Sequence, residues 1–346
     1  AMFKNYLKIA LRNIKKYKFY SLTTVAGLTF GMSCSILILL YVKDELSYER
    51  HHEKADRIYR VIMQLEGQGQ VESSVAHTSL TLAPKLGSTF PEIEKAVRLL
   101  QWRKVTLGHE DKMFNVEQFF LADQSIFEVF TFQFLAGDPK TALTEPYSAV
   151  ITASTAKRYF GDADPLGKLL TAGNKEVYKV TGVIADMPPQ SHFHCDFIGS
   201  LATLGEISDP YRYWGHIYLL LPAGYSPAEL EEKLVAITNQ EALGWFFYGM
   251  RFRLQPITKI HLYSRHSGEL EPNGDIRFVY IFSTIALLIL FIACVNYMNM
   301  ATARFTHRAR EVGIRKVFGS QRLHLIGQFL GESVLFSFGA VILSLM

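Results

Sequence analysis

The sequence predicts an α-helical membrane protein with an α+β extracytoplasmic domain. Three runs of more than 20 residues are apolar and almost free of charge: Tyr20–Val42, Phe278–Thr302 and Leu323–Met346. As a helix, each run is long enough to cross the roughly 30 Å hydrocarbon core of a bilayer. Residues 43–277, between the first two runs, mix strand-like and helix-like patterns without strict βαβ alternation, which favours an α+β domain.

Positive charge is concentrated beside the apolar runs. Six Lys or Arg and no acid precede the first run, and six more lie between the second and third runs against Glu311 alone. Residues 43–277 carry 24 basic and 30 acidic residues. The positive-inside rule therefore predicts that both short basic segments are cytoplasmic and that residues 43–277 lie across the inner membrane, in the periplasm. The net charge of +4 reflects this topology and gives no reason to expect nucleic-acid binding.

The apolar runs set the predicted domain order. Along the chain we expect a cytoplasmic amphipathic helix (1–19), a first membrane span (20–42), a periplasmic domain (43–277), a second span (278–303), a cytoplasmic helix or loop (304–322) and a third span (323–346). Residues 3–18 resemble a helix that lies in the membrane interface; a plain topology anchor is the alternative. The first run exceeds a signal-peptide core and lacks a small-x-small cleavage site, so we expect a retained anchor. Because the chain ends inside the third run, we expect an N-terminal half or fragment of a longer protein.

Two of the predicted spans contain a GxxxG spacing, which lets two helix backbones approach closely. Gly27 and Gly31 lie in the first span, and Gly327 and Gly331 lie in the third. Together they predict a packed helix bundle rather than isolated anchors. Glu332 also lies in the third span, where an ionisable side chain usually faces protein or water. Because it lies near the start of that span it could also reach the interface, and the sequence leaves its role open.

Local patterns predict further elements within residues 43–277. Residues 43–53 remain compatible with a helix, so the first span is predicted to continue as a stalk. Ala55–Met63 alternates apolar and polar residues, as a half-buried strand does. The other predicted elements are a helix within residues 76–95 that ends before Pro91, short strands between about 97 and 184 with a helix at Ser154–Tyr159, strands near Ile217–Leu221 and Phe252–Leu254, and a helix at Pro227–Glu241. Asn273–Asp275 predicts a turn and an N-cap for the second membrane helix.

Residues 161–169 are the nearest match to a phosphate-binding loop, and they fit it poorly. A Walker A motif has four residues between its glycines and a Ser or Thr after its lysine. Here five residues, two of them acidic, separate Gly161 from Gly167, and Leu169 follows Lys168. The sequence therefore predicts a turn at this place and no nucleotide site.

His192, His194, Cys195 and Asp196 form the densest cluster of potential ligands and nucleophiles. Alternate residues of a strand share one face, so the two histidines could bind a metal jointly, but no second HxH or CxxC supplies the two further ligands of a closed site. Cys195 has no activating partner beyond its neighbouring histidine, and it is the one cysteine of residues 43–277. We therefore expect structural roles, with no catalytic residue, no metal and no cofactor in this chain.

The predicted cytoplasmic segment, residues 304–322, combines basic and apolar residues. Glu311 and Arg315 are spaced for an i,i+4 pair on a helix, and Gly319 is placed to end that helix. Val312 and Ile314 belong to an apolar surface, and a linker that is simply exposed to water would not carry so many apolar residues. The segment fits a short helix that docks on a cytoplasmic partner; positive-inside signalling with lipid contact alone is the alternative.

Nine segments of the chain resemble the permeases of the MacB/FtsX superfamily. In the C-terminal part they are Cys294–Arg304, Arg308–Ser320 and Leu325–Ser333. In the predicted periplasmic part they are Phe90–Ile93, Ala149–Thr152, Ala156–Asp162, Asp164–Lys168, Ser191–Phe197 and Ile260–Ser264. The resemblance covers essentially the whole chain and is closest to the branch, common in Bacteroidetes, in which the ATPase is a separate chain.

This resemblance implies a type VII ABC transporter permease, which is not itself an enzyme. The periplasmic part would be a MacB-like core with porter and sabre subdomains, the sabre-like insertion lying at roughly residues 105–185. ATP and Mg²⁺ would be bound by a separate ABC ATPase subunit, whose dimerisation moves the periplasmic domain in the process called mechanotransmission. The ATPase-coupling helix would carry Arg308, Arg310, Glu311, Arg315 and Lys316.

The resemblance also implies partners and a process. Expected partners are a second copy or a second permease module, a periplasmic adaptor, an outer-membrane channel and membrane lipid, and the expected process is export or efflux of a drug, peptide or lipoprotein. Family members have a fourth span, which this sequence lacks. The alternative is a membrane sensor or regulator, for example of a cell-wall hydrolase, whose periplasmic domain binds a ligand. A third span after a short basic loop favours the permease.

Overall fold

The computed structural model describes residues 18–67, 70–102, 105–173, 176–238, 245–248, 250–317 and 322–345. The chain divides into two compact units. One is a helical unit, Ala1–Asp44 with Ile276–Met346, and the other is a core domain, Glu45–Asp275.

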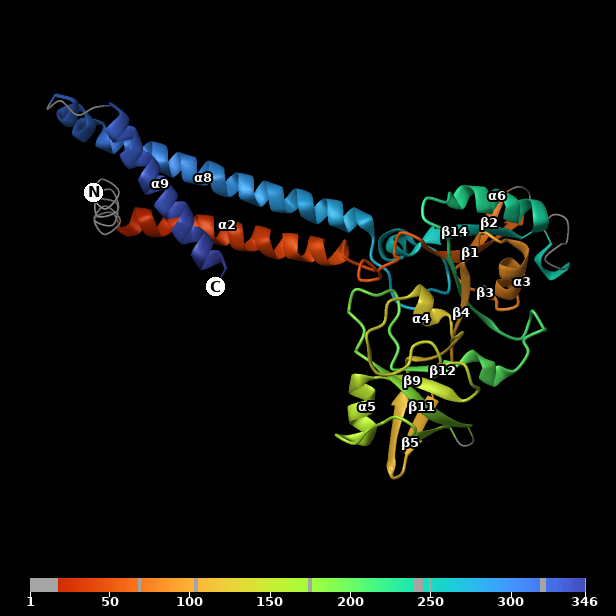
Figure 1. Ribbon diagram of the computed structural model, residues 1–346. Helices are drawn as coiled ribbons and strands as arrows, with labels where there is room; N and C mark the ends of the chain where they lie inside the picture. Colours follow the sequence, from red (N-terminus) through yellow and green to blue (C-terminus); the bar gives the residue numbers. More distant parts are fainter. Residues whose placement is uncertain are drawn as a thin grey trace. The chain divides into compact units, whose positions relative to one another are not determined.

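Fourteen strands form one mixed sheet in the described part of the core domain (Figure 1). They are β1 Ile58–Gly67, β2 Gln70–Val75, β3 Thr78–Ser79, β4 Lys95–Gln101, β5 Val105–His109, β6 Lys112–Val116, β7 Phe119–Ala122, β8 Phe134–Gly137, β9 Ser148–Thr152, β10 Leu169–Ala172, β11 Glu176–Ile184, β12 Phe197–Ser200, β13 Trp214–Leu220 and β14 Arg251–Pro256. The strand order is β14-β1-β13-β4-β7-β12-β9-β11-β10-β5-β6, with β2 paired to β1, β3 to β13 and β8 to β11. The pairs β7–β12 and β9–β11 are parallel, and the other pairs are antiparallel.

Short helices lie against this sheet. They are α3 Leu82–Thr89, α4 Ile126–Val129, α5 Ala153–Phe160, α6 Pro227–Thr238 and α7 Ile260–Tyr263, with 3-10 turns at Leu201–Leu204, Trp245–Phe247 and Ile257–Lys259. Helix α6 packs on β14 and α3 on β4, as Figure 1 shows. Helix α5 begins where the Thr152 side chain accepts a hydrogen bond from the Thr155 N–H, which satisfies one of the free amides of the first turn.

The core forms three clusters of buried apolar side chains around the sheet. Strands β7, β9 and β12 lie in its middle and are buried at every position. Because both faces of these strands are covered, their sequences are continuous runs of apolar and small residues rather than alternating ones. Strand β6 lies at the sheet edge and is exposed at four of its five positions.

The α+β prediction is confirmed, because the core domain is a mixed sheet with helices packed on it. The predicted strand at Ala55–Met63 appears as β1, and the predicted helix at Pro227–Glu241 appears as α6, which ends at Thr238. Strands β5 to β11 occupy most of the predicted insertion at roughly 105–185, and they belong to the same sheet as the rest of the domain.

Two local predictions are wrong in their bounds. The predicted helix before Pro91 is present as α3 and ends at Thr89, but it begins only at Leu82, because Thr78–Ser79 forms the strand β3 beside β13. The stalk does not reach residue 53: helix α2 ends at Glu45 and turns follow. Glu49 has a φ of 63°, in the left-handed region that an α-helix of L-residues cannot contain.

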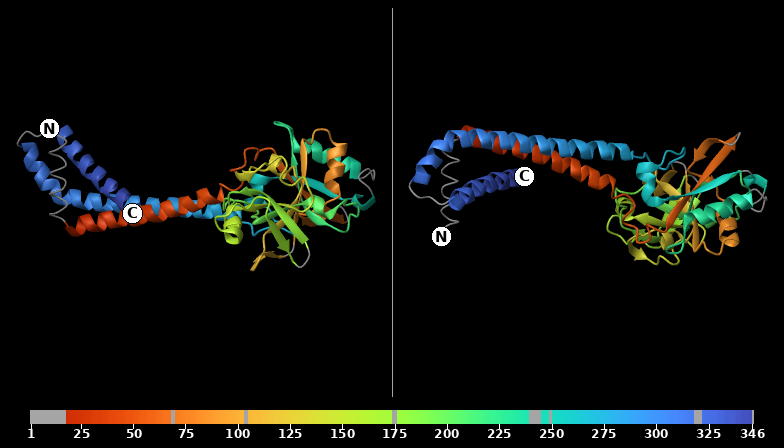
Figure 2. Two further views of the ribbon diagram at one scale, coloured as in Figure 1. Left: turned by 60° about the horizontal axis from the view of Figure 1, so that its bottom comes forward. Right: turned by 90° about the horizontal axis from the view of Figure 1, so that it is seen from above.

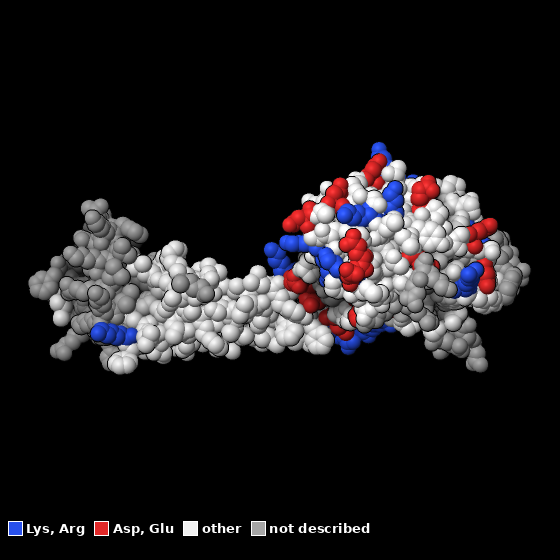
Figure 3. Space-filling model, turned by 90° about the horizontal axis from the view of Figure 1, so that it is seen from below, with Lys and Arg blue, Asp and Glu red and all other residues white. Residues whose placement is uncertain are grey.

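The helical unit contains α2 Lys18–Glu45, α8 Ile276–Val317 and α9 Arg322–Ser344. Among the described residues, Lys18–Glu45 and Ile276–Ala303 are long and apolar enough to span a membrane, and Ser333–Ser344 is a shorter apolar helix. Helices α2 and α8 run side by side (Figure 2), joined by a hydrogen bond from the Ser35 hydroxyl to the Ala286 carbonyl oxygen at 3.1 Å. On the face that Figure 3 shows, the described surface of the helical unit is almost free of charged residues, whereas the core domain shows both signs of charge.

Candidate functional site

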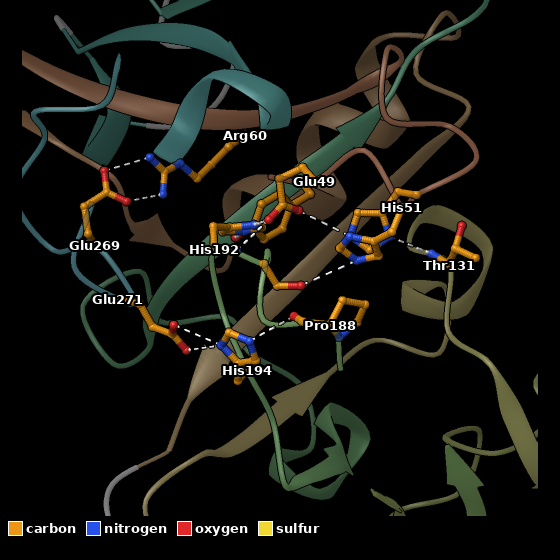
Figure 4. A network of polar contacts seen from close by, with 12 residues as sticks. Glu49, His51, Arg60, Thr131, Pro188, His192, His194, Glu269 and Glu271 are labelled. Atoms are coloured by element: carbon orange, nitrogen blue, oxygen red, sulfur yellow. Dashed lines mark hydrogen bonds and ion pairs between the residues drawn. The ribbon is translucent and has the colours of Figure 1, made fainter. Parts of the chain in front are cut away.

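A network of buried and half-buried polar side chains joins the residues that follow α2 to those that precede α8. We call this network the base cluster. It consists of Glu49, His51, His52, Arg60, His192, His194, Tyr218, Glu269 and Glu271. Its members come from the segment after α2, from β1, from the loop before β12, from β13 and from the loop before α8, and all belong to the core domain. Figure 4 labels seven of them: Glu49, His51, Arg60, His192, His194, Glu269 and Glu271.

Glu49 is the most deeply buried acid of the base cluster. Its side chain is fully buried, and its backbone N–H donates to the Gln190 carbonyl oxygen at 3.0 Å. The carboxylate accepts a hydrogen bond from the His192 backbone N–H, while His192 Nδ1 and His52 Nε2 approach it at 3.1 and 3.3 Å. These two ring contacts lie within ion-pair distance but outside hydrogen-bond geometry. Burial by itself raises the pKa of Glu49, but the attraction of His192 and the contacts of both rings outweigh it and hold this pKa far below its usual range.

His52 attaches this segment to the loop after α4. The Thr131 backbone N–H donates to His52 Nδ1 at 3.1 Å, so this ring nitrogen accepts and carries no proton. The proton of the neutral ring is therefore on Nε2, the atom that faces Glu49. One residue on, the Glu53 backbone N–H donates to the Thr131 hydroxyl at 2.9 Å.

His192 links Glu49 to the central sheet. Its Nε2 lies 2.6 Å from the hydroxyl of Tyr218, which belongs to β13 and is fully buried. Burial raises the pKa of Tyr218, so the hydroxyl keeps its proton at every physiological pH. Glu49, His192 and Tyr218 thus form a chain of polar contacts from the segment after α2 into the sheet.

Arg60 of β1 holds the residues before α8. Its guanidinium binds both carboxylate oxygens of Glu269, at 2.6 and 2.8 Å, and also donates to Gln255 and Ser264. The Arg60 side chain is fully buried and that of Glu269 is 15% exposed. Burial raises the pKa of Glu269, but the hydrogen bonds and charge of Arg60 outweigh it, so the pKa falls below its ordinary value. The pair is therefore ionised.

His194 and Glu271 form a second, more exposed ion pair. His194 Nδ1 lies 2.8 Å from one Glu271 oxygen, and His194 Nε2 lies 3.0 Å from the Pro188 carbonyl oxygen. Both partners are acceptors, so the doubly protonated ring satisfies both. The hydrogen bond with Glu271 raises the pKa of His194 despite its partial burial. In the same way His194 lowers the pKa of Glu271 against the effect of burial.

Glu45 and His261 directly join the end of α2 to the residues that precede α8. The Glu45 carboxylate lies 2.9 Å from His261 Nε2, and the Tyr48 ring stacks on His261 with centroids 3.4 Å apart. A Cβ on Gly274 would lie 2.8 Å from Glu45 Oε2 and 3.0 Å from His261 Nε2. Only glycine therefore fits at position 274 without displacing this pair.

His192 and His194 do not share a ligand position in the structure. They precede β12 in an irregular segment, where His192 faces Glu49 and His194 faces Glu271. Within the described ranges, no three His, Cys, Asp or Glu side chains are arranged to hold a metal ion. Cys195 is buried in the core, which raises the pKa of its thiol and leaves it a poor nucleophile. The geometry of this region suits mechanical attachment of two chain segments.

The predicted packing glycines occupy two environments. A Cβ on Gly31 would lie 2.6 Å from the Ala293 Cβ, and one on Gly27 would lie 3.2 Å from Asn296, so both glycines face α8. At Gly327 and Gly331 a Cβ would meet no described atom within 4 Å. A packing role for these two α9 glycines stays a prediction.

The predicted coupling residues lie on the last part of α8. Arg308, Arg310, Glu311, Arg315 and Lys316 fall within this helix, which continues to Val317, but their side chains lie outside the described residues. The same holds for Glu332 in α9. Their roles stay predictions.

Sequence reasoning did not identify the base cluster as a unit. It singled out His192 and His194 but not Glu49 or Arg60. The available signal was the density of His and Glu in residues 45–53, 192–194 and 261–271, three segments that sequence spacing does not connect.

Two family models match the chain. Residues 21–237 match the MacB-like periplasmic core domain, and residues 283–346 match the FtsX-like permease C-terminal domain. The chain is 26% identical over 277 residues to the macrolide export ATP-binding/permease protein MacB of Burkholderia lata, covering 74% of this chain and 35% of that protein. It is 22% identical over 371 residues to YvrN of Bacillus subtilis, an uncharacterized ABC transporter permease, covering 97% of this chain and 84% of YvrN.

A solved structure shares the fold. It is a domain of a proposed permease protein from Porphyromonas gingivalis, with a TM-score of 0.50 and 23% identity, covering 63% of this chain and 96% of that domain. The chain spans about a third of the length of the curated MacB relatives it matches. The family model of the MacB-like periplasmic core domain alone matches more than half of the chain. The chain therefore belongs to the family of MacB/FtsX-type ABC transporter permeases.

Proposed function

We propose that this chain is a permease subunit that converts ATP hydrolysis by a separate ABC ATPase subunit into movement of its core domain. The core domain would lie in the periplasm and the basic segments in the cytoplasm, as the charge distribution predicts. ATP and Mg²⁺ would be bound by the ATPase. The cargo class is a drug, peptide or lipoprotein, with a second permease module and an adaptor with its outer-membrane channel as partners.

The observation that carries this proposal is the continuity of α8. It is one helix from Ile276, directly after the core domain, to Val317, inside the basic segment. At 1.5 Å per residue such a helix is about 60 Å long, longer than a bilayer is thick. A force applied near residue 310 is therefore carried by helix backbone as far as residue 276.

The base cluster and the separate Glu45–His261 pair supply the other half of the proposal. The residues before α8 are fixed to β1 by the Arg60–Glu269 pair and to the end of α2 by the Glu45–His261 pair. A displacement of either helix end therefore acts on the core sheet and is not absorbed by a free linker. Arg308, Arg310, Arg315 and Lys316 are proposed to contact the ATPase, and Glu311 to pair with Arg315 along the helix.

Co-purification with the ATPase encoded beside this chain tests the proposal. The two proteins are co-expressed and reconstituted in nanodiscs, and we expect the ATPase to co-elute and its hydrolysis rate to change. The double variant Arg310→Glu with Lys316→Glu should lose co-elution. A matched control, Lys140→Glu with Lys179→Glu, makes the same charge change on exposed core-domain positions and should keep it.

Failure of the wild-type full-length protein to retain any ATPase would contradict the proposal. Ligand screens on the core domain would then test the sensor alternative.

A further inference from the structure

Two histidines of the base cluster, His52 and His194, have opposite hydrogen-bond partners. Histidine is the side chain that ordinarily titrates between pH 5 and 8. His194 has two acceptors on its ring nitrogens, so it suits the charged form. His52 accepts from the Thr131 N–H at Nδ1, so it suits the neutral form. The same network therefore contains a contact that acid should disrupt, that of His52, and a contact that acid should preserve, that of His194.

Protonation of His52 is incompatible with its contact to Thr131. A proton on Nδ1 would face the Thr131 N–H, two donors at the 3.1 Å distance of the present hydrogen bond. This contact, with the one from the Glu53 N–H to the Thr131 hydroxyl, fixes the segment after α2 to the loop after α4. Adding the proton therefore removes one of the contacts that hold that segment to α4 and the loop after it.

His51 is also held neutral. Its ring lies 4.0 Å from that of His52 and is half-buried, with Nε2 at 3.4 Å from the Ser191 hydroxyl. Burial, and then the neighbouring His52, lower the pKa of His51 to about 4. His51 thus resists protonation while the cluster is closed.

Charged and titratable groups face this segment from the elements packed on it. They are His192 and His194 of the loop before β12, His261 of α7, which pairs with Glu45 and stacks on Tyr48, and Glu128 of α4, which pairs with Lys95. The rest of the cluster adds Tyr218 and His216 of β13, Arg60 of β1, and Glu269 and Glu271 of the loop before α8. Glu269 already binds Arg60, and Glu271 already binds His194. Among these groups Glu49 is the carboxylate that remains for His51, His52 and His192, so added protons leave excess positive charge in a buried site.

We propose that the base cluster is an acid-sensitive latch. Protonation of His51 and His52 detaches the segment after α2 from the Thr131 loop, while the His194–Glu271 and Arg60–Glu269 pairs keep the residues before α8 attached. Mild acidity around the core domain therefore loosens the segment after α2 and leaves the residues before α8 attached. The effect on transport rests on the proposed function, but the latch itself does not.

The direction and size follow from proton linkage. The stability that neutral His51 contributes is complete above pH 6.5 and is lost as the pH falls toward 4. That of His194, whose pKa is raised, is complete below pH 6.5 and is lost as the pH rises through the raised value. For His51 alone, opening becomes about 30-fold more favourable between about pH 7.5 and about pH 5.

Hydrogen–deuterium exchange of the whole chain in nanodiscs, without ATPase, tests the latch. Rates at about pH 7.5 and about pH 5 are corrected for intrinsic amide exchange. We expect exchange in residues 46–56 to rise about 10- to 30-fold at the lower pH. Residues 260–272 and strand β9 should change less than about 3-fold.

A non-titrating variant gives the control. His51→Asn with His52→Asn keeps an acceptor that can face Thr131, so its exchange in residues 46–56 should differ little between the two pH values. His109→Asn, on β5 outside the base cluster, should retain the full wild-type response.

The proposal is overturned if wild-type residues 46–56 do not respond to pH, or if β9 responds equally, which would indicate global unfolding. Exchange in residues 46–56 and in β9 is measured without the ATPase, so both results remain valid even if the ATPase does not co-purify.

Discussion

The base cluster and the aromatic centre of the same sheet are stabilised in different ways. In the aromatic centre, Phe119 stacks on Phe197 with ring centroids 4.3 Å apart, and Tyr178 packs edge-on against both at 5.7 and 5.3 Å. In the base cluster the fully buried side chains include Glu49 and Arg60, each held by charge and hydrogen bonds. Apolar packing is non-directional and insensitive to protonation, whereas a buried ion pair depends on both partners. The comparison shows that apolar packing stabilises the centre of the sheet, whereas charge and hydrogen bonds stabilise the segments that lead to the helices.

Removal of a ring from the aromatic centre should give the largest loss of stability. Phe197→Ala is expected to lower the free energy of unfolding by about 4 kcal/mol, because it removes a fully buried ring and leaves a cavity. The loss should be the same at about pH 7.5 and about pH 5. Denaturant unfolding followed by tryptophan fluorescence at both pH values measures it, and a loss that depends on pH would mean that the two regions are not independent.

Removal of the buried arginine should have a slightly smaller effect on the free energy of unfolding. Arg60→Met leaves Glu269 without its partner and is expected to cost about 3 kcal/mol. The control Arg98→Met breaks an arginine–aspartate pair of similar geometry whose two side chains are each 21% exposed, and should cost about 1 kcal/mol. Equal losses in the two variants would show that burial of the base cluster does not matter.

A change in the helical unit should be smaller again. Gly31→Leu places side-chain atoms where the Ala293 Cβ lies, so α2 and α8 must separate, at an expected cost of about 1–3 kcal/mol. Gly327→Leu meets no described atom within 4 Å and should be close to neutral. Resistance of the nanodisc-embedded helices to limited proteolysis and to SDS measures both. An equal effect of the two variants would contradict specific packing of α2 on α8.

Much of the fold could be predicted from local patterns. The alternation of Ala55–Met63 predicted β1, and the apolar runs predicted the positions of α2 and the first part of α8. The end of the stalk could not be predicted, because residues 43–53 contain no glycine or proline that would signal the helix end at Glu45 or the left-handed backbone of Glu49. The buried position of Arg60 could not be predicted either, because alternation in a strand does not reveal that its polar face is also covered.

The base cluster could not be assembled from the sequence for a topological reason. Glu49 and His192 are separated by more than 140 residues, and Arg60 and Glu269 by more than 200. Only the strand order, which places β1 next to β13, brings these segments together. The resemblance to MacB/FtsX permeases correctly indicated the family, but it did not indicate this network.

The most direct test of the central claim follows the base cluster through the ATPase cycle. The complex with the ATPase is compared by hydrogen–deuterium exchange without nucleotide and with ATP and vanadate. We predict that exchange in residues 46–56 and 260–272 changes between the two states, that β9 does not change, and that Arg310→Glu with Lys316→Glu abolishes the difference. Unchanged exchange at the base cluster in a complex that binds and hydrolyses ATP would contradict transmission of force through α8 to the core domain.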